Sequence, residues 1–113
     1  MQLNKVLLIG FAGGDAKVLE KAVRLSIATS NPLTKKPDWH QIVAFNKLMD
    51  VAKTIKKGDM VFIEGSISYG EYNDKPTVSI IASTIQKLIS EEEIKIKAKN
   101  LKSQPADTSV DPF

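Results

Sequence analysis

The chain of 113 residues contains no cysteine and only one histidine. Without cysteine there is no disulfide framework, no thiol nucleophile and no zinc site built on thiolates, and this composition fits a reducing compartment. His40 has no partner residues at a metal-ligand spacing, so we interpret it as a buried or interface side chain. We therefore expect no metal and no other cofactor, and the sequence offers little basis for an enzyme.

Long hydrophobic runs are also missing. The main apolar run is the seven residues of Val6–Ala12, whereas a membrane-spanning helix needs about 20. No small-x-small cleavage site of the usual kind follows the run, so we interpret it as a buried strand rather than a targeting signal. The next residues, Gly13 and Gly14, are not followed by Gly-Lys-Ser or Gly-Lys-Thr, so they are interpreted as a turn and not as a phosphate-binding loop.

Charge of one sign is only slightly in excess. The chain has 16 lysines and arginines against 13 acidic residues, a net charge of +3. Residues 1–90 carry 12 − 8 = +4, and residues 91–113 carry 4 − 5 = −1. A mildly basic N-terminal part favours a polyanionic partner, although this signal is weak by itself.

Strand patterns dominate what is present. Alternation and β-branched residues predict five strands, over residues 3–11, 23–29, 38–45, 60–69 and 77–88. Between the third and fourth strands, residues 47–57 have apolar side chains at helical spacing, and Gly58 provides a stop signal. Three strands, one helix and two strands is the order of an OB-fold, an all-β five-stranded Greek-key barrel, although other five-stranded barrels have the same order. We expect this domain to occupy residues 1–89, and residues 90–113 to form a flexible, disordered tail.

The third predicted strand carries two large aromatic residues on one side. Alternation places Trp39, Gln41 and Phe45 on one face, and His40, Ile42 and Ala44 on the other. If the aromatic face points into the core, Gln41 points there too. If it points outward, the exposed aromatic surface indicates a binding partner. The strand pattern alone leaves both possibilities open.

Short motifs along the chain carry a family resemblance. In order they are Asn4-Lys5-Val6, Ile9-Gly10, Gly14-Asp15, Ala28-Thr29-Ser30, Asp38-Trp39-His40 with Val43, Phe45, Lys47 and Leu48, Lys57-Gly58, Val61, Glu64-Gly65, Tyr72-Asn73-Asp74 and Asp111-Pro112-Phe113. In this order they resemble the motifs of bacterial-type single-stranded DNA-binding proteins, a family of homotetrameric OB-fold proteins. The resemblance covers residues 2–89 and the last few residues.

The resemblance implies a cytoplasmic, nucleoid-associated protein that coats and protects single-stranded DNA without reading its sequence, in replication, recombination and repair. It implies a homotetramer, or alternatively a dimer. Bases would stack on Trp39, Phe45 and Tyr72, next to Gln41, because every base has a π-face. Phosphates would contact basic side chains, with release of counterions. The candidates are Lys5, Arg24, Lys35, Lys36, Lys47, Lys57 and Lys75.

Other features receive different expectations. We predict that Tyr69 and Phe11 lie in the core, and that Phe62 packs at a subunit interface. The C-terminal residues Asp111, Pro112 and Phe113 resemble the family's tip, which recruits replication and repair proteins through a basic pocket on the partner. Alternatively, this end of the chain has no function.

The chain also departs from the family pattern. The loop over residues 30–37 is short, and Leu33 stands about where the family often stacks a tryptophan. Residues 66–70 lack the arginines usually found there, and the tip has few acidic residues. These departures favour weaker binding, a smaller footprint or an auxiliary family member. Two alternatives therefore remain: a primosome-like OB-fold accessory that mainly binds proteins, and an RNA-binding barrel.

Overall fold

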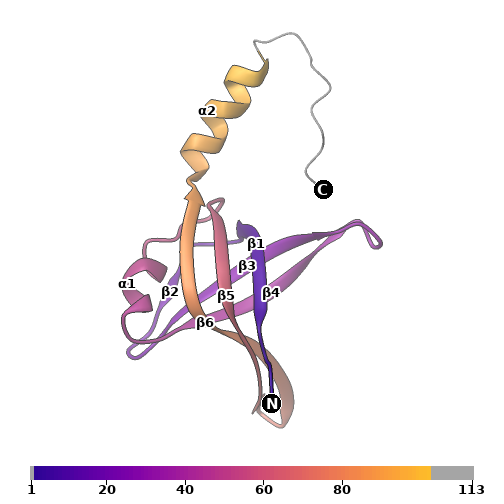
Figure 1. Cartoon of the computed structure of the whole chain (residues 1–113), viewed down its shortest axis with the longest axis vertical. Helices are drawn as coiled ribbons and strands as arrows, with labels where there is room; N and C mark the ends of the chain where they lie inside the picture. Colours follow the sequence, from indigo (N-terminus) through magenta and orange to yellow (C-terminus); the bar gives the residue numbers. More distant parts are fainter. Residues whose placement is uncertain (1, 103–113) are drawn as a thin grey trace.

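The structure, a computed structural model, describes residues 2–102 and consists mainly of strands (Figure 1). Its elements are β1 (Val6–Ala12), β2 (Lys17–Val18), β3 (Val23–Asn31), β4 (Lys36–Ala44), α1 (Leu48–Ala52), β5 (Met60–Tyr72), β6 (Lys75–Ile89) and α2 (Glu91–Lys102). The two-residue strand β2 pairs with the start of β3 and has no counterpart in the prediction.

Five of the strands close into a barrel. Around the ring, β1 pairs with β5, β5 with β6, β6 with β4, β4 with β3, and β3 with the end of β1. Among the described strands, the one parallel pairing is between β4 and β6, where Ile42 lies opposite Ile80 and Val43 opposite Ile81. Closure by this pairing, with α1 between β4 and β5, confirms the predicted OB-fold.

The barrel interior is filled by alternate residues of its strands. Val23 and Ile27 of β3, Ile42 of β4, and Val61 and Ile63 of β5 have no exposed surface. Each such side chain contributes on the order of 1.5–3 kcal/mol by its removal from water. These core residues follow the two-residue period that predicted the strands.

Helix α1 and the turn after it cover part of the barrel with Ala52 and Ile55, which are both buried. The helix is shorter than the predicted span of 47–57. It ends because the amide of Ile55 bonds to the carbonyl of Ala52 at 3.1 Å, an i→i−3 contact that tightens the last turn.

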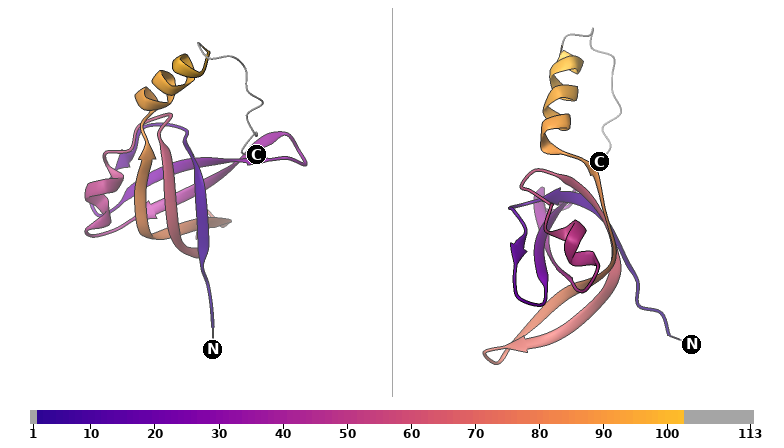
Figure 2. Two further views of the ribbon diagram at one scale, coloured as in Figure 1. Left: turned by 45° about the horizontal axis from the view of Figure 1, so that its top comes forward. Right: turned by 90° about the vertical axis from the view of Figure 1, so that its left-hand side faces the viewer.

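Two hairpins extend beyond the barrel (Figure 2). Strands β3 and β4 stay paired as far as Asn31 and Lys36, so half of the predicted loop over residues 30–37 is strand. Strands β5 and β6 stay paired as far as Tyr72 and Lys75, around a two-residue turn. In that turn Asn73 and Asp74 have φ of 52° and 63°, the left-handed conformation that hairpin turns of this length favour.

The expected flexible tail begins in the structure with a helix, which is a correction to the prediction. Helix α2 continues from the end of β6 and extends away from the barrel (Figure 1). Its first turn is capped by the Ser90 hydroxyl, which accepts a hydrogen bond from the Glu93 amide at 3.2 Å. Three glutamates in the first turn suit the helix dipole, and Glu91 pairs with Lys95 at 3.1 Å. The tip Asp111-Pro112-Phe113 lies outside the described residues.

Candidate nucleic-acid interface

The outer face of β4 carries the aromatic residues that the alternation placed together. Trp39 is 56% exposed and Phe45 is 41% exposed, and Gln41 is exposed between them. The opposite face supplies Ile42 and Ala44 to the core. Of the two orientations that the sequence left open, the structure therefore has the aromatic side chains outside the barrel.

Trp39 is held from below by the turn after β1. A Cβ atom built on Gly13 would lie 2.2 Å from a carbon of the Trp39 ring, so the ring lies directly on the glycine backbone. Gly13 is itself fixed, because its amide donates a hydrogen bond to the carbonyl of Ser26 at 2.9 Å. The missing side chain at residue 13 therefore positions the ring, while more than half of the Trp39 surface stays open.

Strand β3 provides a low surface beside these aromatic residues. Ala28 lies opposite Trp39, and Ser26 lies opposite Gln41. Both residues on β3 are small, so they leave space above the sheet in which a flat ligand can contact Trp39 and Gln41. This is an arrangement that suits stacking of a base on the tryptophan.

A groove of about 630 Å³ lies between this surface and the β5–β6 hairpin. It brings together three of the predicted site residues, Arg24 from β3, Gln41 from β4 and Tyr72 from β5. Tyr72 is 71% exposed at the end of the hairpin. The remaining lining consists of Leu19, Val43, Glu71, Thr77, Val78 and Ser79. The groove thus combines a cation, an amide and an aromatic ring.

The predicted lysines are spread around the molecule and do not line this groove. Lys35 and Lys36 lie in the β3–β4 turn beside Leu33, which is 93% exposed, and Lys47 precedes α1. Lys75 lies opposite Tyr72 in the β5–β6 hairpin. These positions follow the outside of the barrel, where a bound strand could pass.

Two predicted phosphate contacts lie away from the groove, and one of them has a side-chain partner in the protein. The Lys5 ammonium forms an ion pair with Glu64 at 3.0 Å, which offsets part of its charge. The Lys57 backbone amide donates to the Asp15 carboxylate at 2.9 Å, close to the base of α2, while its side chain is exposed. Neither residue borders the groove.

Two aromatic residues that we predicted in the core are exposed, so these predictions are wrong. Tyr69 is 77% exposed because it lies on the part of the β5–β6 hairpin beyond the barrel. Phe11 is 38% exposed because β1 directs its odd-numbered residues outward, with Gly10 and Ala12 inside. Period-two alternation identifies two faces of a strand but does not say which one meets the core.

Leu19 and Val78 line the groove, and no sequence pattern had marked either residue as part of a site. Leu19 follows β2, an element that the sequence did not indicate. Val78 lies on β6, where its contact with the groove depends on the twist of the hairpin. The one available signal was the length of the two predicted strands, residues 60–69 and 77–88, on either side of Asn73 and Asp74. Two long strands joined by a short turn indicate a long hairpin.

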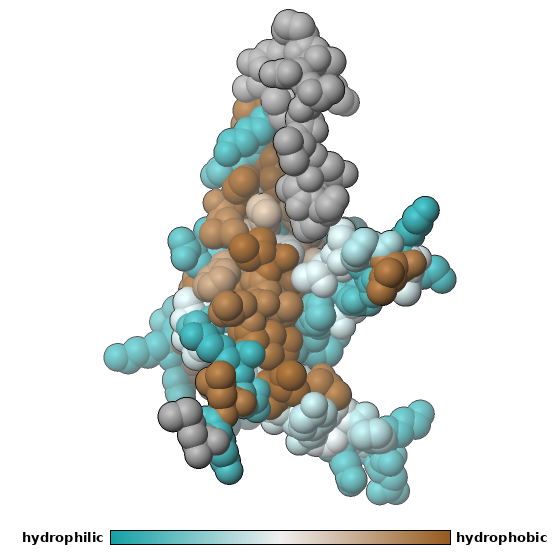
Figure 3. All heavy atoms as spheres, turned by 45° about the vertical axis from the view of Figure 1, so that its right-hand side comes forward, coloured by the Kyte–Doolittle hydropathy of each residue, from teal (hydrophilic) through white to brown (hydrophobic). Residues whose placement is uncertain are grey.

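A second surface is apolar and belongs to β1 and β5. Leu7 is 59% exposed and Ile9 is 48% exposed on the outer face of β1. Ile9 pairs with Phe62 of β5, and Phe11 pairs with Met60. We call these five residues the apolar face. Figure 3 shows hydrophobic side chains gathered in a band that runs from α2 down over the barrel. Phe62 is half-buried there, and its predicted place at a subunit interface stays a prediction.

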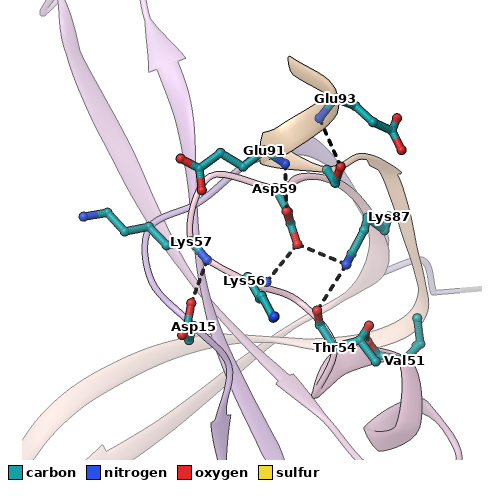
Figure 4. A network of polar contacts seen from close by, with 10 residues as sticks. Asp15, Val51, Thr54, Lys56, Lys57, Asp59, Lys87, Glu91 and Glu93 are labelled. Carbon is teal, nitrogen blue, oxygen red and sulfur yellow. Dashed lines mark hydrogen bonds and ion pairs between the residues drawn. The ribbon is translucent and has the colours of Figure 1, made fainter. Parts of the chain in front are cut away.

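Asp59 is the buried charged residue of the described chain, 3% exposed, and it joins α2 to the barrel (Figure 4). Its carboxylate accepts hydrogen bonds from the backbone amides of Lys56 at 2.8 Å and Glu91 at 3.0 Å. The ammonium of Lys87 lies 3.2 Å from the same carboxylate and donates to the carbonyl of Thr54.

Burial by itself raises the pKa of Asp59, but these contacts outweigh it. The two amide hydrogen bonds and the charge of Lys87 favour the ionised form, and the net effect is a pKa below the ordinary value of 3.8. The base of α2 is therefore held by a carboxylate that stays charged near neutral pH.

The described residues show little that suits metal or membrane chemistry. Within residues 2–102 no three histidine, cysteine or acidic side chains are grouped as they would be around a metal ion. His40 is half-buried, and its Nε2 lies 2.8 Å from the hydroxyl of Thr29. No helix in this part of the chain is long and apolar enough to cross a membrane.

Comparison with known proteins gives a consistent family. Residues 3–88 match the model of the single-strand binding protein family. Over 88 residues the chain is 38% identical to single-stranded DNA-binding protein 1 of Chlorobaculum tepidum, covering 66% of this chain and 54% of that protein. It is 34% identical over 98 residues to a single-stranded DNA-binding protein of Neisseria meningitidis, covering 75% of this chain and 56% of that protein.

A mitochondrial protein of an animal is also similar to the chain. The mitochondrial single-stranded DNA-binding protein of Danio rerio is 35% identical over 103 residues, covering 74% of this chain and 70% of that protein. The chain spans just over half the length of the two bacterial relatives, 54% and 56%. The family model covers the whole barrel, and the resemblance seen in the motifs is confirmed. The chain belongs to the single-strand binding protein family.

Proposed function

We propose that the chain binds single-stranded DNA independently of sequence, by stacking bases on aromatic side chains and by neutralising phosphates. The observation that carries this proposal is the outward Trp39, which lies on the same strand face as Gln41 beside the groove that Arg24 and Tyr72 line. Stacking on exposed aromatic rings binds any base with about 1–3 kcal/mol per base. The names of the relatives support the same ligand.

The strand would follow a path that starts at the β3–β4 turn and crosses β4. Lys35 and Lys36 would contact phosphates at the turn, Trp39 and Phe45 would stack bases, and Lys47 would contact a phosphate beyond Phe45. Arg24, Gln41 and Tyr72 would hold the strand in the groove, with Lys75 near the hairpin end. Because Lys5 is paired with Glu64 and Lys57 lies near α2, we assign these two residues a smaller part.

The fluorescence of Trp39 tests this function, because it is the chain's single tryptophan. Titration with oligo-dT should quench it strongly at low salt and less at high salt, while duplex of the same length should have little effect. The slope of log K against log salt should be about −0.7 per neutralised phosphate. Absence of both quenching and binding would favour the accessory that mainly binds proteins.

A competition experiment distinguishes an RNA ligand from a DNA ligand. Stacking does not distinguish the two sugars, so an exposed aromatic face suits RNA as well as DNA. Equal lengths of oligo-dT and oligo-U should compete for the same Trp39 signal, and the DNA should displace the RNA at lower concentration. Preference for oligo-U would replace DNA by RNA as the ligand.

We also propose that the chain self-associates, as a dimer or a tetramer, through the apolar face. Within the described residues, β1 pairs with β3 only at Phe11 and Ala12, so the edge of residues 6–10 on that side has no strand partner. An open strand edge beside exposed apolar side chains suits pairing with a second copy. Ile9 and Leu7 would then be covered by the partner.

The C-terminal tip would recruit replication and repair proteins. A terminal phenylalanine after proline, with a nearby carboxylate, fits capture by a basic pocket. Removal of Asp111, Pro112 and Phe113 should abolish pull-down of such proteins and leave the affinity for oligo-dT unchanged. Equal pull-down by the truncated chain would assign recruitment to another surface.

A further inference from the structure

The outer part of the β5–β6 hairpin stands free of the barrel. Strand β4 pairs with β6 only at Ile80 and Ile81, so in the described chain residues 66–79 are joined to no third strand. Near the start of this ribbon the register shifts between Glu64 and Gly65, where Ser83 of β6 is left without a partner in the ladder.

Exposure along the inner face of β5 shows where the core ends. Ile63 is completely buried, Ile67 is 37% exposed and Tyr69 is 77% exposed, although all three belong to the same alternation. Tyr69 therefore has no partner layer above it. An aromatic ring of this exposure adds little to folding, which makes it available for a ligand.

Tyr69 also lies next to the groove. It pairs directly across the hairpin with Val78, and Val78 lines the groove together with Gln41 and Tyr72. Cβ atoms of directly paired residues are about 4.5–5.5 Å apart. The ring of Tyr69 is thus the neighbour of a groove residue, three residues before Tyr72 along β5 and on the opposite face of the hairpin.

The charge of the hairpin decides what kind of contact it can make. Residues 66–79 contain one cation, Lys75, and two carboxylates, Glu71 and Asp74, so the net charge is 1 − 2 = −1. A ribbon of this net charge offers phosphates a single cation, Lys75. Any further attraction for a nucleic acid must come from its aromatic and apolar side chains.

We propose that Tyr69 is an additional base-stacking residue, which lets the hairpin hold the DNA strand beyond Val78, on the face of the hairpin opposite to Tyr72. This proposal rests on the proposed function, since it concerns the same ligand. A strand that leaves the groove across Val78 meets Tyr69, and the uncharged contact compensates for the scarcity of cations on this hairpin. The footprint on DNA is accordingly longer than the groove alone would give.

Fluorine NMR provides a direct test, because Tyr69 and Tyr72 are the chain's only two tyrosines. The full chain labelled with 3-fluorotyrosine should give two resonances, which the Tyr72→Phe variant assigns. Addition of oligo-dT should shift the Tyr69 resonance, and duplex of equal length should not. A Tyr69 resonance that stays in place while Trp39 fluorescence is quenched would overturn the proposal.

Affinity gives an independent test with matched variants. Tyr69→Ala should weaken binding of a long oligo-dT by about 5- to 100-fold, the range expected for one stacked base, and shorten the footprint. Tyr69→Phe should bind like the parent chain, and so should Ser68→Ala, which alters the neighbouring exposed residue. Because the contact is uncharged, the loss should be equal at low and high salt, with the same salt slope.

The outcomes separate this proposal from the proposed function. If the parent chain binds oligo-dT and Tyr69→Ala binds equally well, only the role of Tyr69 fails. If the parent chain does not bind single-stranded DNA, the proposed function and the role of Tyr69 both fail. A Tyr69 resonance that moves with protein concentration before DNA is added would instead assign the residue to a contact between copies, and that would also overturn the proposal.

Discussion

Trp39 combines a fixed position with an open surface. Its ring rests on Gly13, and its exposed part faces the low surface of Ser26 and Ala28. Replacing an exposed ring removes little core packing, but it removes the stacking surface. This separation between stability and binding makes the residue a sensitive test of the outer face of β4.

Trp39→Ala should weaken oligo-dT binding by about 1–3 kcal/mol, because one stacked base is lost, with little change in melting temperature. Trp39→Phe should keep much of the affinity. Fluorescence anisotropy of a labelled oligo-dT measures both variants. A collapse of the melting temperature with unchanged affinity would mean that the ring serves the fold.

Asp59 has the opposite character, since its contacts are structural. Asp59→Ala should lower the free energy of unfolding by about 2–5 kcal/mol, because it leaves two amides and the Lys87 ammonium without their buried acceptor. Urea denaturation measures this loss. The control is Asp50→Ala, which breaks an exposed ion pair with Lys53 and should change stability by about 0.5 kcal/mol or less. Equal effects of the two substitutions would contradict a special role for Asp59.

The stability that Asp59 contributes should depend on pH. Its folded-state pKa lies below 3.8, so its ionised form stabilises the fold fully above that ordinary value. The contribution is lost as the pH falls through the folded-state pKa. The difference in unfolding free energy between the parent chain and Asp59→Asn should therefore be constant near neutral pH and shrink below pH 3.8. If this difference grows as the pH falls, the pKa of Asp59 is raised by folding and not lowered.

At the scale of elements, helix α2 is stabilised mainly by contacts of its first turn. Its exposed surface is large, so packing contributes less than the cap of Ser90, the early glutamates and the anchor at Asp59. The β5–β6 hairpin depends instead on its turn, where Asn73 and Asp74 tolerate positive φ better than most residues.

Ser90→Ala should destabilise α2 by about 1 kcal/mol, since the Glu93 amide loses its acceptor. Hydrogen exchange of the amides of residues 93–96 should become faster, while exchange in the barrel strands stays unchanged. Ser68→Ala, on the exposed hairpin, is the matched control and should leave α2 protected. Unchanged exchange in α2 after removal of the Ser90 hydroxyl would show that the anchor at Asp59 suffices.

At the scale of the whole molecule, two different surfaces divide the barrel. The groove combines Arg24, Gln41 and Tyr72, whereas the apolar face on β1 and β5 is made of five hydrophobic side chains with the Lys5–Glu64 ion pair at its edge, beside Leu7. Exposed apolar surface of this kind marks an interaction site in soluble proteins. A barrel that self-associates through the apolar face would leave the stacking residues free for the strand.

Ile9→Glu should shift the chain toward the monomer, because it places a charge where a second copy would cover the residue. Sedimentation velocity over a range of concentrations measures this change. Val18→Glu is the control, because Val18 is 58% exposed on β2, outside the apolar face. If the parent chain is already monomeric at high concentration, or if both variants behave alike, the apolar face is not the contact.

The sequence by itself determined the barrel. Alternation in β3, β4 and β5 sorted their residues into two faces, one of which holds Val23, Ile42 and Ile63, and the helical spacing before Gly58 located α1, because these patterns reflect local geometry. The motifs around Trp39 and Tyr72 determined the family. The sequence also contains Ser90-x-x-Glu93, a helix-capping motif at the start of α2. The polar composition after residue 89 led to the prediction of a flexible tail instead.

Only the tertiary structure decided which face of each strand is covered, and where the core stops. Tyr69 and Ile63 share one alternation, yet one is exposed and the other buried, because β4 pairs with β6 over two residue pairs and leaves the hairpin free. Likewise, Leu19 and Val78 reach the groove through strand twist and closure, which bring distant segments together. A local sequence pattern depends only on the geometry of one strand, whereas the burial of a residue depends on which other elements pack against that strand.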